Sequence, residues 1–106
     1  MWTGRYEYTD GRDGVDFTQE LTFSQGLVTG FVSEPNTFGD GTSKNLYATL
    51  EGSVSGNAIE WVKTYDGTAG VSHSVEYGGT LDRTKRTIAG RWKIGALSGP
   101  FTLSLQ

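Results

Sequence analysis

An alternation of apolar and polar residues, interrupted by turn-forming residues roughly every 8 to 14 positions, constrains the fold of this chain most. In the clearest run, from Val15 to Phe23, the odd positions are apolar except for Gln19 and the even positions are polar. Because successive side chains of a strand point to opposite faces, this pattern predicts strands buried on one face only. No segment has a sustained helical period or a helix-capping signature. We therefore predict an all-β fold.

The turn signals divide the chain into eight expected strands. Asp-Gly and Gln-Gly pairs and a Ser-Gly-Asn triplet are typical of tight turns between strands. One longer irregular connection, from Glu34 to Asn45, is also rich in turn formers. The expected strands are residues 2–8, 15–23, 27–33, 46–54, 59–65, 73–81, 88–94 and 101–105.

Two features favour a single up-and-down antiparallel β-barrel, and a β-sandwich is the alternative. First, strands in a small barrel coil strongly, and glycine relieves crowding where a strand bends or a neighbouring ring needs space. Glycines fall on the inward-facing parity of several strands: Gly4, Gly30, Gly52, Gly79 and Gly90. Second, the connections are mostly short, so successive strands are expected to be neighbours. The register of residues 27–33 stays open, because both of its faces carry apolar residues.

Length, charge and cysteine content limit the classes of function. A chain of 106 residues suffices for one domain with one core. Its net charge of −3 provides no basic field, so we expect neither nucleic acid nor a membrane as partner. The absence of cysteine and the single histidine argue against thiol chemistry and metal sites, and we expect no cofactor. No charged-then-apolar leader precedes Trp2, which predicts a soluble, cytoplasmic protein.

Two short motifs point to a known architecture. The chain opens on Trp2-Thr3-Gly4-Arg5-Tyr6 and carries a late Gly90-Arg91-Trp92. With eight short strands, this arrangement resembles the calycin group of small barrels, which includes lipocalins, fatty-acid-binding proteins and avidins. The resemblance is architectural and implies that Trp2 plugs one end of the barrel. The last strand lacks the Arg-x-Tyr with which fatty-acid-binding proteins hold a carboxylate, and biotin binding is not implied.

The inward-facing parity carries a distinctive set of polar side chains. A lysine between Trp61 and Tyr65 on the core side is costly unless its ammonium finds a partner or reaches water. One hypothesis is therefore that the lumen binds a small aromatic or acidic hydrophobic ligand; the alternative is that Lys63 lies at the rim and extends into solvent. The candidate ligand-binding residues are Gln19, Trp61, Lys63, Tyr65, His73, Tyr77 and Trp92.

The outer wall offers a second hypothesis. Strand 27–33 is apolar on both faces, and apolar residues also face outward on the strands that follow, so a contiguous exposed patch is expected. Such a patch would serve self-association, for instance as a homodimer, or a protein partner. Its candidate residues are Leu27, Phe31, Tyr47 and Val62, with Val28 and Val32 in place of the first two in the other register. A third and weaker hypothesis is an isomerase or cyclase that works inside the barrel with His73 or Lys63.

Overall fold

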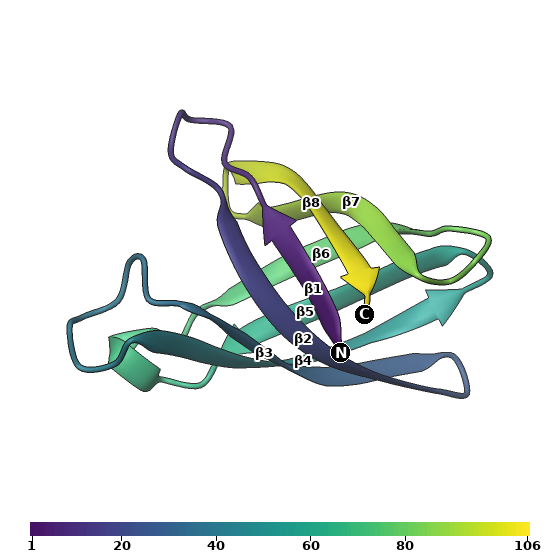
Figure 1. The fold of residues 1–106 in the computed structure, drawn as a ribbon, viewed down its shortest axis with the longest axis horizontal. Helices are drawn as coiled ribbons and strands as arrows, with labels where there is room; N and C mark the ends of the chain where they lie inside the picture. The colour runs from purple at the N-terminus through teal and green to yellow at the C-terminus, as the bar shows by residue number, and fades with distance from the viewer.

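The computed structural model describes residues 1–106 and is a closed barrel of eight antiparallel strands (Figure 1). Each strand pairs with the next along the chain, and the first closes the barrel against the last through pairs such as Trp2 with Leu105. This topology confirms the predicted up-and-down barrel and excludes the sandwich. The strands are β1 (Trp2–Tyr6), β2 (Val15–Ser24), β3 (Leu27–Pro35), β4 (Asn45–Ser55), β5 (Ala58–Tyr65), β6 (Ser74–Leu81), β7 (Thr87–Ile94) and β8 (Leu97–Leu105).

The register of β3 is settled by burial. Val28 and Val32 point into the barrel and are buried, whereas Leu27 and Phe31 point outward and are exposed. The strand continues two residues beyond Ser33, because Glu34 pairs with Leu46 and Pro35 with Asn45 on β4. The expectation that an irregular connection begins at Glu34 is therefore wrong. On the alternating pattern of β3, Glu34 falls on the inward face with the two valines.

The inward glycines lie where neighbouring backbones approach closely. A Cβ atom at Gly52 would overlap the carbonyl oxygen of Glu60 and lie 2.6 Å from the Cβ of Trp61 on the paired strand β5. A Cβ atom at Gly90 would similarly overlap the backbone of Gly78 and Gly79 on β6. These contacts agree with the crowding expected in a small, strongly coiled barrel.

The connections gather at the two ends of the barrel. Residues 7–14, 36–44 and 66–73 and the turn at 95–96 lie at one end, here called the mouth. The segment 66–73 contains the three-residue 3-10 helix η1 (Thr68–Gly70), which lies beside the 36–44 connection through a hydrogen bond from the amide of Asp40 to the carbonyl of Ala69 (Figure 1). The opposite end, here called the hairpin end, holds the β2–β3, β4–β5 and β6–β7 turns and both termini.

The lumen between the two ends is filled by side chains. A single cluster of 21 buried hydrophobic residues runs through it. Trp2 is 4% exposed and lies near the hairpin end. η1 is far too short to cross a membrane, and it is the barrel's only helical segment. The space left for a ligand therefore lies at the ends of the barrel rather than in its middle.

Candidate functional site

A small pocket opens at the mouth and is lined mainly by aromatic rings. Its volume is about 130 Å³. Five of the seven ligand-binding residues predicted from the sequence line it: Lys63, Tyr65, His73, Tyr77 and Trp92. The other lining residues are Tyr6, Tyr8, Arg12, Phe38, Val75, Ile94 and Leu97.

An ion pair lies among the rings that line this pocket. The Nζ of Lys63 lies 3.1 Å from Oε2 of Glu34, and the two side chains are 2% and 0% exposed. The residues come from β5 and β3, which lie on either side of β4. Lys63 therefore does not extend into solvent at the rim, as the alternative hypothesis proposed. Because a buried charge is costly unless it is paired and hydrogen-bonded, Glu34 is what allows Lys63 to be buried.

Three tyrosine hydroxyls complete this cluster. Tyr65 and Tyr6 donate hydrogen bonds to Oε1 of Glu34, over 2.6 and 3.3 Å. The Lys63 ammonium donates to the hydroxyl oxygen of Tyr77 over 2.9 Å. The ammonium also lies 4.7 Å from the ring centre of Tyr65 and 5.1 Å from those of Tyr6 and Tyr77, within the range of cation–π attraction.

The surroundings of these groups keep their protons in place. Burial by itself lowers the pKa of Lys63. The electrostatic interactions and hydrogen bonds with Tyr77 and Glu34 raise it by more than burial lowers it, so the pKa lies above its ordinary value. Burial, followed by the negative charge of Glu34, raises the pKa of both Tyr6 and Tyr65 far above the usual range. Burial likewise raises the pKa of Tyr77. The lysine is therefore charged and the three phenols are neutral donors over the whole physiological range of pH.

Two protons of the cluster have no acceptor in the protein. An ammonium has three protons, and Lys63 donates hydrogen bonds to only two partners, Glu34 and Tyr77. The Tyr77 hydroxyl accepts from Lys63, and its own proton makes no hydrogen bond. Both residues line the mouth pocket. The pocket therefore combines apolar walls with two donors able to serve a molecule that enters it.

The rim of the pocket is formed by the mouth connections. The Phe38 ring lies 5.6 Å from that of Tyr65 and 5.7 Å from that of His73. His73 precedes β6 rather than lying within it, and its side chain is exposed at the mouth. Burial, then the positive charge of Lys63, lowers the pKa of His73. Arg12 covers the Tyr8 ring at 4.0 Å and is paired with Asp10.

Two of the predicted residues, Gln19 and Trp61, lie deeper and do not line the pocket. Trp61 stacks face to face on Tyr77, with 5.2 Å between ring centres and 7° between the ring planes. The Nε1 of Trp61 and the Nε2 of Gln19 are buried without a hydrogen-bond partner. Trp61 therefore packs against the Tyr77 ring and does not line the pocket that a ligand would enter.

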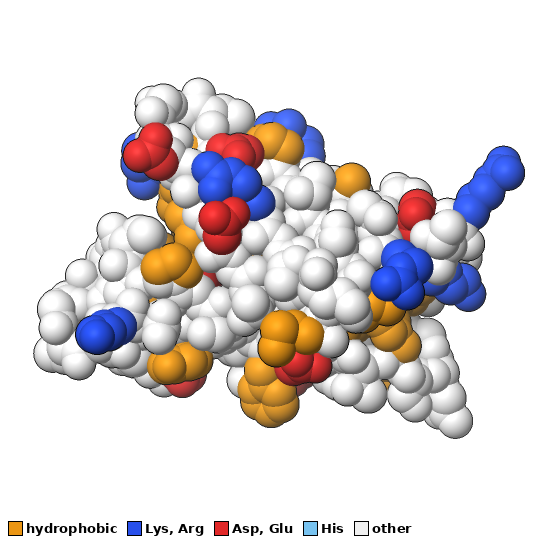
Figure 2. All heavy atoms as spheres, in the orientation of Figure 1, with side chains coloured by type: hydrophobic (Ala, Val, Ile, Leu, Met, Phe, Trp, Pro, Cys, Tyr) orange, Lys and Arg blue, Asp and Glu red, His pale blue; other side chains and the backbone are white.

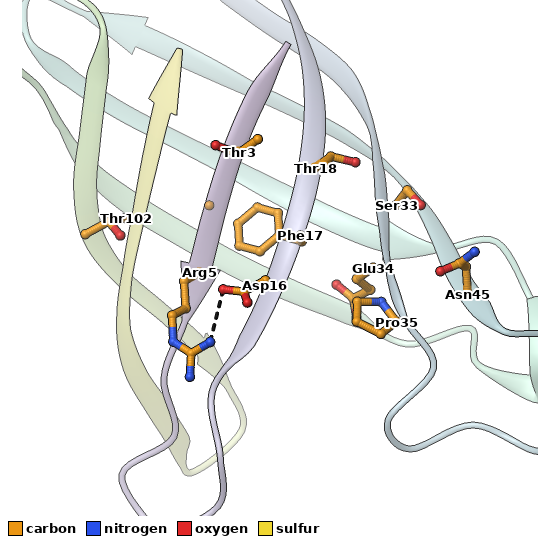
Figure 3. A pocket seen from close by; sticks show the side chains of 11 residues that line it. Thr3, Arg5, Asp16, Phe17, Thr18, Ser33, Glu34, Pro35, Asn45 and Thr102 are labelled. Atoms are coloured by element: carbon orange, nitrogen blue, oxygen red, sulfur yellow. Dashed lines mark hydrogen bonds and ion pairs between the residues drawn. The ribbon is translucent and has the colours of Figure 1, made fainter. Parts of the chain in front are cut away.

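A second hollow lies in the barrel wall between β2 and β3 (Figure 3). Pairing of these strands begins at Thr18 with Ser33, so the first residues of β2 pair only with β1. The resulting groove of about 470 Å³ is lined mainly by polar and charged side chains, with Phe17 the one aromatic residue among them. Its one cation, Arg5, is already paired with Glu7 and Asp16. Because the groove is shallow and presents no unpaired charged group, we do not place the site there.

The outer face of β3–β5 carries the four apolar residues that were predicted to form an exposed interaction patch. Leu27, Phe31, Tyr47 and Val62 are 60%, 68%, 43% and 43% exposed. Phe31 pairs with Thr49 on β4, which places Tyr47 diagonally next to it on the same face. Val62 lies opposite Glu51 on the following strand pair. Of the two registers left open by the sequence, the structure has the one with Leu27 and Phe31 outward, which places these apolar residues on one wall.

Sequence reasoning missed Glu34, which holds the cluster together. The missed signal is the parity of β3: once Val28 and Val32 are assigned to the core, continuing the strand puts Glu34 inside as well. A buried lysine on β5 also requires an acidic partner, which the other inward positions do not supply. Arg12 and Phe38 carried no comparable signal, because both lie in irregular connections.

Comparisons of the chain with family models, with curated proteins and with solved structures gave no match. No group of three or more histidine and acidic side chains is arranged to hold a metal ion. The interpretation of the site therefore rests on its own geometry.

Proposed function

We propose that the barrel mouth binds a small, uncharged, planar molecule that carries a hydrogen-bond acceptor. The observation that carries this proposal is the pair of protons, on Lys63 and Tyr77, that have no acceptor in the protein. An acceptor that enters the pocket would add a hydrogen bond to these donor groups, which is worth about 0.5–1.5 kcal/mol. Such a molecule would complete the hydrogen bonding of the cluster.

The size and walls of the pocket limit the ligand to about one ring. A volume of about 130 Å³ is close to the roughly 150 Å³ that suffices for benzene in an apolar cavity. The Tyr8 and Trp92 rings, 5.5 Å apart and nearly perpendicular, form an aromatic corner of the pocket. A flat ring would make offset or edge contacts there, which aromatic pairs prefer.

The sequence led us to expect either an aromatic or an acidic ligand. The charges around the pocket favour the aromatic ligand. The positive charge of Lys63 is already neutralised by Glu34, and that of Arg12 by Asp10. A carboxylate entering the pocket would lose its hydration and gain no unpaired cation at its base. A carbonyl oxygen, a nitrile nitrogen or a pyridine-type nitrogen would instead accept hydrogen bonds from Lys63 and Tyr77 and would bring no charge into the pocket.

The proposal is tested with three ligands of similar shape: benzonitrile, toluene and benzoate. Benzonitrile has an acceptor, toluene has none, and benzoate adds a negative charge. We expect benzonitrile to bind about two- to tenfold more tightly than toluene, the worth of one hydrogen bond. Benzoate should bind more weakly than both. Equal affinity for all three, measured by ligand-observed NMR, would contradict the proposal.

A tyrosine variant separates the hydrogen bond from the apolar contact. Tyr77→Phe removes the free phenolic proton and keeps the ring that stacks on Trp61. Benzonitrile should then lose the part of its advantage over toluene that comes from the Tyr77 proton and keep the part that comes from Lys63. Tyr47→Phe removes a hydroxyl on the outer wall and is the matched control, for which the advantage should persist.

The exposed wall of β3–β5 supports a second candidate function, self-association. Phe31 is 68% exposed on the outer face of a central strand, and Leu27, Tyr47 and Val62 lie on the same wall. In Figure 2 hydrophobic side chains protrude next to acidic ones along the lower edge of the molecule. Sedimentation velocity tests this proposal: a concentration-dependent dimer that Phe31→Ser abolishes would support it. A strict monomer at high concentration would contradict it.

A further inference from the structure

The largest apolar hollow of the molecule lies not at the mouth but at the hairpin end. It is a cleft of about 570 Å³ between the β2–β3 hairpin, the β4–β5 turn, the β6–β7 turn and the termini. Trp2 and Leu81 lie within it, and Leu105 of the last strand adds to its wall. The volume falls within the range of about 300–1,000 Å³ that is typical of sites for small organic molecules.

Two large apolar side chains at the edge of this cleft are left in solvent. Phe23 and Leu27, on either side of the β2–β3 turn, are 44% and 60% exposed. Leu27 is the first residue of β3, and its side chain belongs to the cleft as well as to the outer wall. Contiguous exposed apolar surface of this kind marks binding sites in soluble proteins.

Lys85 is the one charged residue among those that line the cleft, and no aspartate or glutamate is among them. Lys85 makes no ion pair in the protein, since its turn partner Asp82 uses its carboxylate on Thr84 and on the amides of Arg86 and Thr87. Figure 2 shows Lys and Arg side chains beside hydrophobic ones at the right of the view, with an acidic side chain next to them.

We propose that this cleft binds a soluble organic anion with one apolar chain. The chain would occupy the apolar floor, and the anionic group would lie beside the unpaired ammonium of Lys85. Carboxylate, sulfate and phosphate head groups share the required chemistry. The site is at the opposite end of the barrel from the mouth pocket, so it is independent of the function proposed for that pocket.

The test compares three ten-carbon amphiphiles below their micelle concentrations: decyl sulfate, decyl maltoside and decyltrimethylammonium. The readout is the ¹H–¹⁵N NMR signals of the three tryptophan indoles, because Trp2 lines the cleft and Trp92 lines the mouth. We expect decyl sulfate to bind most tightly and the cation least tightly, with the Trp2 signal moving and that of Trp92 unchanged. Equal binding of sulfate and cation, or movement of Trp92 alone, would overturn the proposal.

Three variants locate the contacts. Leu27→Ser should abolish binding of decyl sulfate, whereas Phe31→Ser, four residues along the same strand and outside the cleft, should leave it unchanged. Lys85→Asn suits the left-handed backbone at this position, where φ is 58°, and should weaken decyl sulfate about two- to fivefold without affecting decyl maltoside. A Lys85 variant that weakens both equally would contradict the placement of the head group.

One further arm distinguishes a free amphiphile from a lipid surface. The cleft is recessed between hairpins, so we expect no sedimentation of the protein with phosphatidylglycerol vesicles. Cosedimentation that Leu27→Ser prevents would overturn the proposal of a soluble ligand in favour of a membrane.

Discussion

Lys63 and Glu34 form an ion pair inside the barrel, with 3.1 Å between Nζ and Oε2 and almost no exposure of either side chain. The pair joins β3 and β5 across β4, and three tyrosines surround it. Its position closes the lumen beneath the mouth and leaves only a small pocket above. The first prediction concerns what happens when one member is removed.

Replacing Lys63 alone should destabilise the barrel strongly. Lys63→Met leaves the Glu34 carboxylate buried without its counter-charge, which typically costs about 3–5 kcal/mol of the free energy of unfolding. Urea denaturation followed by tryptophan fluorescence measures this loss. A stability unchanged within about 1 kcal/mol would show that the pair does not contribute as described.

Removing both charges should restore most of that loss. A buried ion pair replaced by neutral side chains of similar volume is often neutral for stability, because both desolvation costs disappear together. We therefore expect the double variant Lys63→Met with Glu34→Gln to lie within about 2 kcal/mol of the parent protein. Losses that simply add in the double variant would contradict direct coupling of the two residues.

The stability of the barrel should fall at alkaline pH. The pKa values of Lys63, Tyr6, Tyr65 and Tyr77 are all raised in the folded state. A group with a raised pKa stabilises the fold below its unfolded pKa and loses that effect as the pH rises beyond it. The ordinary values are 10.0 for tyrosine and 10.5 for lysine, so the free energy of unfolding should decline above about pH 10. Urea titrations on either side of that pH check this, and the double variant should show a shallower decline.

The buried amide of Gln19 should be dispensable. Its Nε2 is buried without a hydrogen-bond partner, an arrangement that typically costs about 1–3 kcal/mol. Gln19→Met keeps the length of the side chain and removes the unpaired donor, so we expect the midpoint of urea unfolding to rise. A clear loss of stability would indicate that the amide is satisfied by a bound water.

Two glycines, Gly52 on β4 and Gly78 on β6, should respond differently to alanine. At Gly52 a Cβ atom would overlap the carbonyl of Glu60, whereas at Gly78 nothing lies within 4 Å of it. Gly52→Ala should therefore cost about 1–3 kcal/mol or more through forced separation of β4 and β5. Gly78→Ala is the control and should be near neutral. Similar thermal midpoints for the two variants would contradict the close strand approach.

Period-two patterning predicted the strands and most of the inward face, and the inward glycines and short connections were enough to predict the barrel and its strand order. The alternation placed Lys63, Tyr65 and Tyr77 on the core side because each lies an even number of positions from a clear core residue of its strand, Trp61 or Val75. It missed Glu34, since proline and asparagine directly after it look like the start of a loop. In the structure, pairing with β4 keeps that segment extended.

The mouth itself was beyond what alternation can predict. Arg12, Phe38 and His73 reach the pocket from irregular connections, where backbone direction depends on tertiary contacts rather than on a repeating pattern. The choice between an acidic and an uncharged ligand likewise depended on Glu34, because the same lysine attracts an anion when unpaired and does not when neutralised.

The central claim, that the mouth pocket and its two free donors form a binding site, is tested most directly by titrating benzonitrile while observing the three indole NH signals. Trp92 lines the pocket and its Nε1 donates to the carbonyl of Glu7, whereas Trp2 lies at the other end of the barrel. We predict a saturable shift of the Trp92 signal, an unchanged Trp2 signal, and a Trp92 shift that saturates only at higher benzonitrile concentration in Tyr77→Phe. A shift of Trp2 without Trp92, or no saturable shift at any concentration, would contradict the assignment of the mouth as the site.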